Sequence, residues 1–414
     1  MATNEGTAKR APRGPERTAP WRIQLPVYAA GLFSNSISDL ASIALPLYLA
    51  TIDPSPVLIG LVIGARHFLP LLLAIHGGAL MDRLGARRLM VFCSALSVVV
   101  MLLFPTTGVI PLIILLQLIN GLCASMGWIG AQTSFGLMLH GNQTYSGRFA
   151  FALRLGSFIG PPLTGVAWDQ FGPWGAFGMM ALWAAGTLAS ALAIAPTDLD
   201  RPQEGRRLRF VDLLPRLSDY RAAFRLATIP GMTIVLMVTV LRIAASGIQD
   251  SFYTIYLVSI GLSATLIGVL VTLSSALAAM SSLMVGRLTR YMSPVWLLLL
   301  TTFGSIVFVS ITPLLGGFAS LAVVAALRGV CMGISQPLML SILVDAAGRG
   351  SQGKGVALRT TANRVAGAVT PAAMGAIAGV AGLEASFLIM GALLSVATAA
   401  VSAYVWRRPA LSDG

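Results

Sequence analysis

Two side chains of opposite charge lie inside long apolar stretches near the start of the chain. Asp39 falls in the stretch 24–50, and Arg66 falls in the stretch 57–80. A carboxyl group held away from water can bind and release a proton, and a nearby arginine can control that exchange. As antiparallel helices, the two stretches would bring both charges to a similar depth. We therefore predict a buried Asp39–Arg66 pair that serves either proton coupling or helix packing.

Other polar side chains also interrupt the apolar stretches, and they are candidates to line a substrate cavity. Asn35 lies one helical turn from Asp39 and therefore on the same face. The full candidate set is Asn35, Gln132, Arg242, Gln249, Asp250, Tyr253, Arg328, Gln336 and Asn363.

The charges among these deep groups are unbalanced. Two carboxylates, Asp39 and Asp250, stand against five arginines, namely Arg66, Arg154, Arg242, Arg328 and Arg364. A positive cavity favours an anionic or carboxylate-bearing substrate. A lipophilic cation would instead need carboxylates and aromatic surfaces, so the two substrate classes remain open.

The elements that position these residues are long apolar stretches. The chain has 414 residues, of which 56% are hydrophobic and 10% are charged, whereas soluble domains carry roughly a quarter charged residues. Stretches of about 20 apolar residues can cross a bilayer as helices. We predict an all-α integral membrane protein with twelve transmembrane helices, at 24–50, 57–80, 88–107, 109–139, 146–170, 173–195, 229–258, 263–286, 292–314, 317–346, 353–380 and 384–406.

The distribution of charge predicts the orientation in the membrane. Lys and Arg cluster at the chain ends and in alternate connections, while the opposite connections carry Asp53, Asp169 and Glu384. By the positive-inside rule, we expect both termini to be cytoplasmic. The excess of Arg over Lys, 26 to 2, is typical of a high-GC bacterial genome, so we expect a bacterial inner membrane. The net charge of +13 is therefore explained without nucleic acid. The predicted divisions are a tail at 1–23, a six-helix half at 24–195, a cytoplasmic linker with an amphipathic helix at 196–228, a second half at 229–406 and a tail at 407–414.

The two halves repeat one another. Leu58-Ile59-Gly60 recurs 208 residues later as Leu266-Ile267-Gly268. A second match, at an offset of 210, relates Arg154, Pro161 and Gly165 to Arg364, Pro371 and Gly375. Parallel repeats of this kind predict two pseudo-symmetric six-helix halves with the substrate site between them near the midplane.

These features resemble the major facilitator superfamily over residues 24–406. The segment between the second and third stretches is similar to the family's cytoplasmic loop, a glycine turn with an Asp and flanking basic residues. It comprises Gly78, Asp82, Arg83, Gly85, Arg87 and Arg88. The resemblance implies a cytoplasmic lock, although the second copy at 286–290 lacks the Asp.

The fifth stretch resembles the signature of the family's proton-coupled drug antiporters. The matching residues are Gly156, Gly160, Pro161 and Gly165, with Thr164 standing where a second Gly is usual. Small residues four apart also suit plain helix packing, which is the alternative. In addition, Gln117 occupies a position where many members carry Arg, so a proton-relay role for that site is not transferred. The resemblance implies that the first, fourth, seventh and tenth helices line the cavity.

The leading hypothesis is therefore a secondary active transporter that exports a small organic molecule by alternating access, with H⁺ as the coupling ion. The alternative is an uptake carrier for an organic anion, and a remote third is a transporter-like receptor. We expect no enzyme activity, metal or cofactor, because no phosphate-binding loop, metal-spaced cluster or nucleophile–base set is present. The expected partners are the lipid bilayer and the substrate, and the chain is expected to function as a monomer.

Overall fold

The chain folds into long helices that pack side by side. The computed structural model describes residues 20–73, 81, 85–139, 143–196, 230–347 and 352–408. Within these ranges the regular structure is entirely helical, which confirms the predicted all-α class. Residues 1–19 of the predicted N-terminal tail, and the predicted linker 196–228 beyond residue 196 with its amphipathic helix, lie outside the described residues.

Six spans form the first half of the molecule. The second span continues from α2 as far as Leu73. The fifth and sixth spans are the two arms of α6, which bends at Gly172, where φ is 61°. The elements are α1 (Trp21–Ile52), α2 (Pro56–Ala65), α4 (Ala86–Leu103), η1 (Phe104–Thr106), α5 (Ile110–Leu139) and α6 (Gln143–Ala193).

The second half repeats this arrangement with one irregular span. Its first span runs from α8 through a π-helical turn, η4, into α9. The elements are α8 (Pro230–Ile248), η4 (Gln249–Tyr253), α9 (Thr254–Ser259), α10 (Ala264–Ser282), α11 (Val285–Leu288), α12 (Pro294–Ser310), η5 (Thr312–Leu314), α13 (Phe318–Ala347), α14 (Gln352–Ala381) and α15 (Leu383–Trp406).

Among the described residues, nine helices are long and apolar enough to cross a membrane. The helix α12 is slightly shorter, and the two arms of α6 are counted there as one. The helix α1 is the remaining span, and its polar residues Asn35, Ser38 and Asp39 lower its hydropathy. Together these helices give the twelve spans that the sequence predicts.

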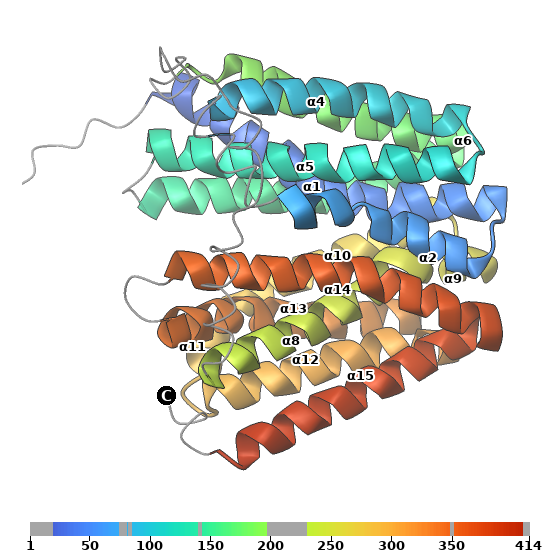
Figure 1. Cartoon of the computed structure of the whole chain (residues 1–414), viewed down its shortest axis with the longest axis vertical. Coiled ribbons are helices and arrows are strands. Elements are labelled where there is room, and N and C mark those ends of the chain that lie inside the picture. Colours follow the sequence, from blue (N-terminus) through green and yellow to red (C-terminus); the bar gives the residue numbers. More distant parts are fainter. Residues whose placement is uncertain are drawn as a thin grey trace, which may run out of the picture.

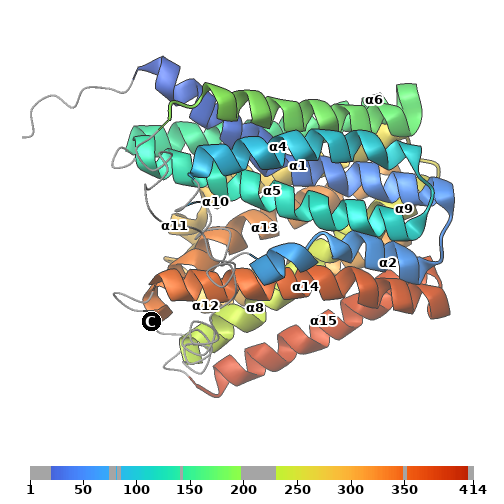
Figure 2. The ribbon, with the colours of Figure 1, turned by 45° about the horizontal axis from the view of Figure 1, so that its top comes forward.

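The two halves lie against each other with their helices roughly aligned (Figure 1). The start of α1 and the end of α15 lie at the same end of the bundle, at the left in Figures 1 and 2. We call this the terminal end and the opposite one the far end. The chain reverses at the far end through residues with positive φ, namely Asp53, Gly172, Gly261 and Gly382.

The halves meet through close backbone contacts at repeat-related glycines. Gly60 of α2 faces the carbonyl of Pro371 in α14, and Gly268 of α10 faces the carbonyl of Pro161 in α6. A Cβ at either glycine would collide with that carbonyl, and small residues are what allow membrane helices to approach this closely. The sequence repeat is therefore a repeat of helix packing across the interface.

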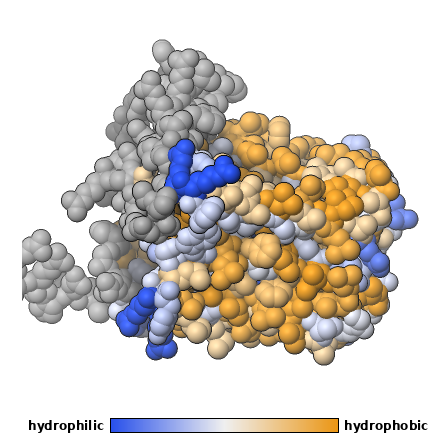
Figure 3. Space-filling model, turned by 90° about the horizontal axis from the view of Figure 1, so that it is seen from below, coloured by the Kyte–Doolittle hydropathy of each residue, from blue (hydrophilic) through white to orange (hydrophobic). Residues whose placement is uncertain are grey.

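The outer face of the bundle is apolar. Figure 3 shows hydrophobic residues covering most of the visible surface, with hydrophilic residues concentrated toward the ends. Large apolar side chains such as Phe92, Leu182 and Val396 are more than half exposed. A surface of this kind requires lipid rather than water as solvent, so the chain is a multi-pass membrane protein.

One packing contact yields a direct test of stability. Gly121 of α5 lies against the backbone carbonyl of Arg66, and a Cβ there would overlap that carbonyl. We expect Gly121→Ala to lower the unfolding free energy by about 1–3 kcal/mol, because the backbone must move to relieve the overlap. Thermal unfolding of the purified protein in detergent would measure this change.

Gly136 on the same helix provides the matched control. A Cβ at Gly136 meets no atom within 4 Å, so Gly136→Ala should be neutral, or stabilising by up to about 1 kcal/mol through helix propensity. Equal melting temperatures for Gly121→Ala and the wild type would contradict the predicted overlap.

Candidate functional site

An ion pair joins the two halves between α2 and the seventh span. The Nη2 atom of Arg66 lies 3.4 Å from Oδ2 of Asp250, and the two side chains are 15% and 37% exposed. Arg66 directly follows α2, and Asp250 lies in η4. Single π-helical turns are frequent at functional sites, because they re-aim side chains within an otherwise regular helix.

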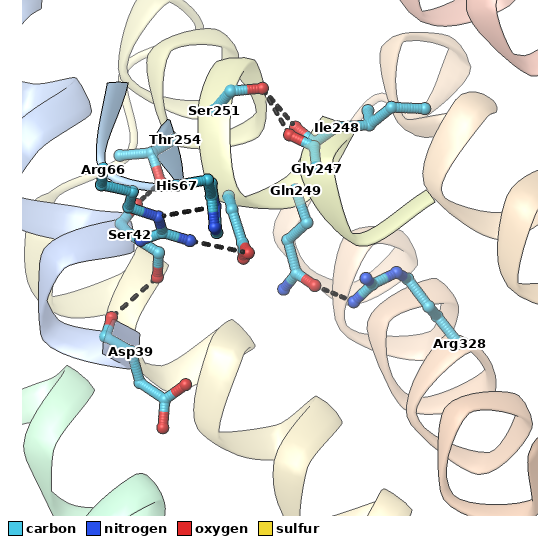
Figure 4. A network of polar contacts seen from close by, with 11 residues as sticks. Asp39, Ser42, Arg66, His67, Gly247, Ile248, Gln249, Ser251, Thr254 and Arg328 are labelled. Carbon is cyan, nitrogen blue, oxygen red and sulfur yellow. Dashed lines mark hydrogen bonds and ion pairs between the residues drawn. The ribbon is translucent and has the colours of Figure 1, made fainter. Parts of the chain in front are cut away.

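This pairing corrects the sequence-based prediction of an Asp39–Arg66 pair. The partner of Arg66 in the structure is Asp250 from the other half of the molecule. The carboxylate of Asp39 points away from Arg66 (Figure 4) and faces Ser157 of α6. The prediction failed because helix depth was the only guide, and depth does not determine the direction in which a side chain points.

His67 extends the cluster around Arg66. Nε of Arg66 donates a hydrogen bond to Nε2 of His67 at 3.1 Å. Because Nε2 accepts, this geometry places the proton of a neutral imidazole on Nδ1. That Nδ1 atom is buried and has no hydrogen-bond partner within the described part of the chain. A second proton on His67 would remove the acceptor that Arg66 uses.

Asp39 lies on a polar face of α1. Its backbone carbonyl accepts a hydrogen bond from the hydroxyl of Ser42 at 2.7 Å, and Asn35 donates to Oγ of Ser157 at 3.4 Å. Asn35 and Asp39 are partly exposed, and Ser38 between them is exposed. Asp250 and Arg66 are close enough to act on the charge of Asp39. This face therefore belongs to the same electrostatic cluster as the ion pair.

A second polar group lies within the second half. A guanidinium nitrogen of Arg328 donates to Oε1 of Gln249 (Figure 4). Both side chains, with Tyr253 and Thr312, form the polar part of a small pocket between η4, α12, η5 and α13. The cavity volume of about 10 Å³ is near the minimum that holds one water molecule. Nε of Arg328 is buried without a partner in the described part of the chain.

The predicted cavity residue Asn363 and its neighbour, the deep arginine Arg364, lie in α14 near the interface of the halves. Arg364 of α14 donates to the hydroxyl of Ser125 in α5 at 3.1 Å, so it bridges the halves. Asn363 is half-buried, and its Oδ1 has no partner among the described residues. Gln132 of α5 and Gln336 of α13 are exposed, and their place in a cavity stays a prediction.

The loop motif falls partly outside the described residues. Gly78, Asp82 and Arg83 are not described, so the predicted lock is untested. Gly85, with φ of 88°, precedes α4. Arg87 donates to the carbonyls of Ala191 and Leu192, at 3.2 and 3.0 Å, where a cation meets the negative end of α6. Arg88 is exposed.

The fifth-span motif makes close helix contacts. Gly156 lies against the carbonyl of Leu32 and the side chain of Ser36, and Gly160 lies against Leu40, all in α1. Gly165 faces the carbonyl of Ala264 at the start of α10. The motif therefore packs α6 on α1 within its own half and on α10 across the interface.

Sequence reasoning missed a polar contact at the far end. Asp169 of α6 accepts hydrogen bonds from the backbone N–H groups of Ala264 and Thr265, at 3.0 and 2.9 Å, and from the hydroxyl of Thr265 at 2.6 Å. This carboxylate of the first half thus caps the N-terminus of α10 in the second half. The sequence indicated only that Asp169 is an acidic residue in a connection at the far end, and this did not predict the cap.

The family model of the Major Facilitator Superfamily matches residues 27–246 and 235–414. The chain belongs to this superfamily. Membership makes it a membrane transporter rather than an enzyme, and it accounts for the two repeated halves. No functionally curated protein matches the sequence.

Solved structures of other transporters share this fold. A mutant of the nucleoside transporter NupG superposes with a TM-score of 0.75 at 14% identity, covering 93% of this chain and 99% of that one. A peptide transporter POT in complex with sulfate gives a TM-score of 0.70 at 15% identity, covering 97% of each chain. At such identities the likeness establishes the fold and leaves the substrate open.

The observed ion pair can be distinguished from the predicted one by mutation. We expect Asp250→Asn to lower the unfolding free energy by on the order of 1–3 kcal/mol, because it leaves the mostly buried Arg66 without its counter-charge. This is less than for a fully buried pair, since Asp250 is 37% exposed. Asp39 takes no part in this ion pair, and Asn has the same shape as Asp. Asp39→Asn should therefore lower the unfolding free energy less than Asp250→Asn does.

Chemical unfolding of the purified variants would measure both effects. The double variant Arg66→Gln/Asp250→Asn should recover part of the lost stability, since the unpaired charge is gone. A larger loss of unfolding free energy for Asp39→Asn than for Asp250→Asn would contradict the observed ion pair and favour the predicted Asp39–Arg66 pair.

Proposed function

We propose that this chain moves a small organic molecule across the membrane by alternating access, with H⁺ as the coupling ion. The observation that carries the proposal is the cluster of Asp39, Arg66, His67 and Asp250 at the interface of the halves. Ionisable groups inside a membrane bundle mark substrate and proton pathways. A cluster contributed by both halves can sense whether they are closed or open.

The ion pair supplies a mechanism for coupling. A proton on Asp250 would neutralise the carboxylate and weaken its attraction to Arg66, and a proton on His67 would remove the other partner of Arg66. Arg66 would then be free to turn toward Asp39 or toward a substrate. Because proton and substrate act on the same arginine, each changes the affinity for the other by the same factor.

The contacts at the far end support a closed state there. Gly165 meets Ala264, Gly60 meets Pro371, and Asp169 caps α10, all between the halves and toward the far end. Rocking of the halves about the midplane would break these contacts and open that side. We therefore infer that the conformation in this structure is closed at the far end and open toward the terminal end.

Orientation and direction complete the proposal. The basic clusters support a cytoplasmic terminal end, by the positive-inside rule, and the excess of Arg over Lys supports a bacterial inner membrane. Export is favoured by the fifth-span motif, although that motif serves packing here. Because both halves of one chain form the cluster, a monomer within the lipid bilayer would suffice. Uptake of an organic anion is the second candidate, and the excess of deep arginines favours it.

Reconstituted vesicles would test proton coupling. With a pH-sensitive dye inside, we would offer cationic dyes, neutral antibiotics and organic acids in turn. Substrate-driven proton movement opposite to the substrate is expected in the wild type. It should fall by about tenfold or more in Asp39→Asn, because the amide cannot carry a proton. Control vesicles contain Glu384→Gln, which changes an exposed carboxylate at the far end. Transport without proton movement, equal in the wild type and Asp39→Asn, would exclude coupling through Asp39.

The far-end cap allows a separate test of alternating access. Asp169→Ala removes three hydrogen bonds that hold the halves together, so the closed state should lose about 1–2 kcal/mol, which is up to about thirtyfold in population. A cysteine at Ser38, on the exposed polar face of α1, would report far-end opening through faster labelling by a membrane-impermeant thiol reagent.

Glu384→Ala is the matched control for this test. Glu384 is also a carboxylate at the far end, but it lies in the first turn of its own helix, α15. The Glu384→Ala variant should therefore leave the labelling rate unchanged. The parent protein without Ser38→Cys gives the background labelling. Equal labelling in Asp169→Ala and Glu384→Ala would contradict a role of Asp169 in closing the far end.

A further inference from the structure

Arg242 is a buried cation that has no counter-charge among the described residues. It lies in α8, the residue is 8% exposed, and its Nε atom is buried without a hydrogen-bond partner in the described part of the chain. The charged side chains close enough to act on it, among those described, are Arg359 and Arg328. A guanidinium removed from water without an acceptor is strongly unfavourable.

Arg328 and Arg359 also form no ion pair with a carboxylate in the described part of the chain. Arg328 is 6% exposed, and its printed hydrogen bond goes to the neutral amide of Gln249, while its Nε has no partner among the described residues. Arg359 of α14 is half-buried, and no ion pair holds it within the described ranges. The carboxylate near Arg328 is Asp250, which is already bound to Arg66.

The three arginines are staggered in depth. Measured along their helices from the terminal end, Arg359 lies about 10 Å inside, Arg242 about 18 Å and Arg328 about 28 Å, at 1.5 Å per residue. We call these three residues the arginine ladder. Its steps of about 10 Å lead from the terminal end toward the level of the Arg66–Asp250 pair.

We propose that the arginine ladder binds the anionic group of the transported molecule, which is therefore a small organic anion bearing a carboxylate, phosphate or similar oxyanion. The inference rests on the proposed transport function and names the substrate class for that site. Guanidinium groups bind oxyanions through paired hydrogen bonds. An arriving anion would supply the acceptors that Arg242 and Arg328 lack, which compensates for their removal from water.

This assignment also explains why titratable groups surround Arg66 while the second half carries the three arginines of the ladder. The carboxylate of Asp250 and the imidazole of His67 contact Arg66, and Asp39 lies within electrostatic reach of both charges of the pair. These groups suit proton exchange. The arginine ladder in the second half holds a fixed positive charge that does not titrate at physiological pH. An anion bound at Arg328 would lie beside the Arg66–Asp250 pair, and it would compete with the carboxylate of Asp250 for the guanidinium groups of Arg328 and Arg66.

The test uses matched probes of opposite charge on the purified full-length chain in detergent. Benzoate, phenylphosphonate and benzyltrimethylammonium are added separately at equal ionic strength, and the melting temperature is followed against probe concentration. A ligand that binds only the folded state adds RT ln(1 + c/Kd) to the unfolding free energy, where c is its free concentration, so the melting temperature rises with probe concentration and the rise yields Kd. We expect stabilisation by at least one of the two anions and none by the cation.

Variants locate the site. Arg242→Gln and Arg328→Gln should each weaken anion binding by about tenfold, the loss expected for one charge-assisted hydrogen bond. Arg290→Gln, at an exposed arginine of the same half, should bind as the wild type does. Without any probe, Arg242→Gln should melt at the same or a higher temperature, because it removes an unpaired buried charge.

The outcomes separate this inference from the transport function. Absence of stabilisation by both anions, or equal binding in Arg242→Gln, Arg328→Gln and Arg290→Gln, would overturn the anion site. Vesicle flux of a neutral or cationic compound alone would likewise overturn it, while transport itself stands. Anion binding that needs Arg242, with no flux of any compound, would instead reject transport and keep the site.

Discussion

The ion pair between Arg66 and Asp250 is the interaction on which the organisation of this interface depends. It joins the end of α2 to the π-helical turn of the seventh span, and hence one half of the molecule to the other. Charges within a membrane bundle are tolerated only where they find partners or a water-accessible cavity. His67 contacts the same arginine and Asp39 lies within electrostatic reach of the pair, so a proton gained by either residue acts on the charges of the pair.

Close helix packing makes this polar interface possible. Glycines at repeat-related positions let α2 approach α14 and let α10 approach α6 until backbone carbonyls occupy the space of a side chain. The bundle has no hydrophobic driving force between its helices in lipid, so such contacts carry the association. They lie toward the far end, together with the cap that Asp169 forms on α10. The polar residues at mid-depth can then face a space between the halves.

The two halves are similar in fold but differ in chemistry. The first half contributes a carboxylate, an imidazole and one arginine to the centre, while the second contributes Asp250 and the arginine ladder. The far end is also asymmetric, because the residue at the position equivalent to Asp169, at the repeat offset of 210, is Gly379. A pseudo-symmetric scaffold therefore places unlike functional groups on either side of one interface, as proton coupling and anion binding would require.

The sequence by itself determined the fold. Apolar stretches of membrane-spanning length, basic clusters in alternate connections and the repeat of Leu58-Ile59-Gly60 suffice, because lipid imposes helices and a repeat imposes two halves. It also identified Asp39, Arg66, Asp250 and Arg328 as deep polar groups.

Only the tertiary structure decided the partners of those groups. Arg66 binds Asp250 rather than Asp39, because side-chain direction depends on the packing of α1 against α6 and on the π-helical turn. Asp169 caps α10 across the interface, and Arg242 is left without a counter-charge among the described residues. Such contacts join residues that are far apart in the sequence, and their geometry is set by how the halves meet.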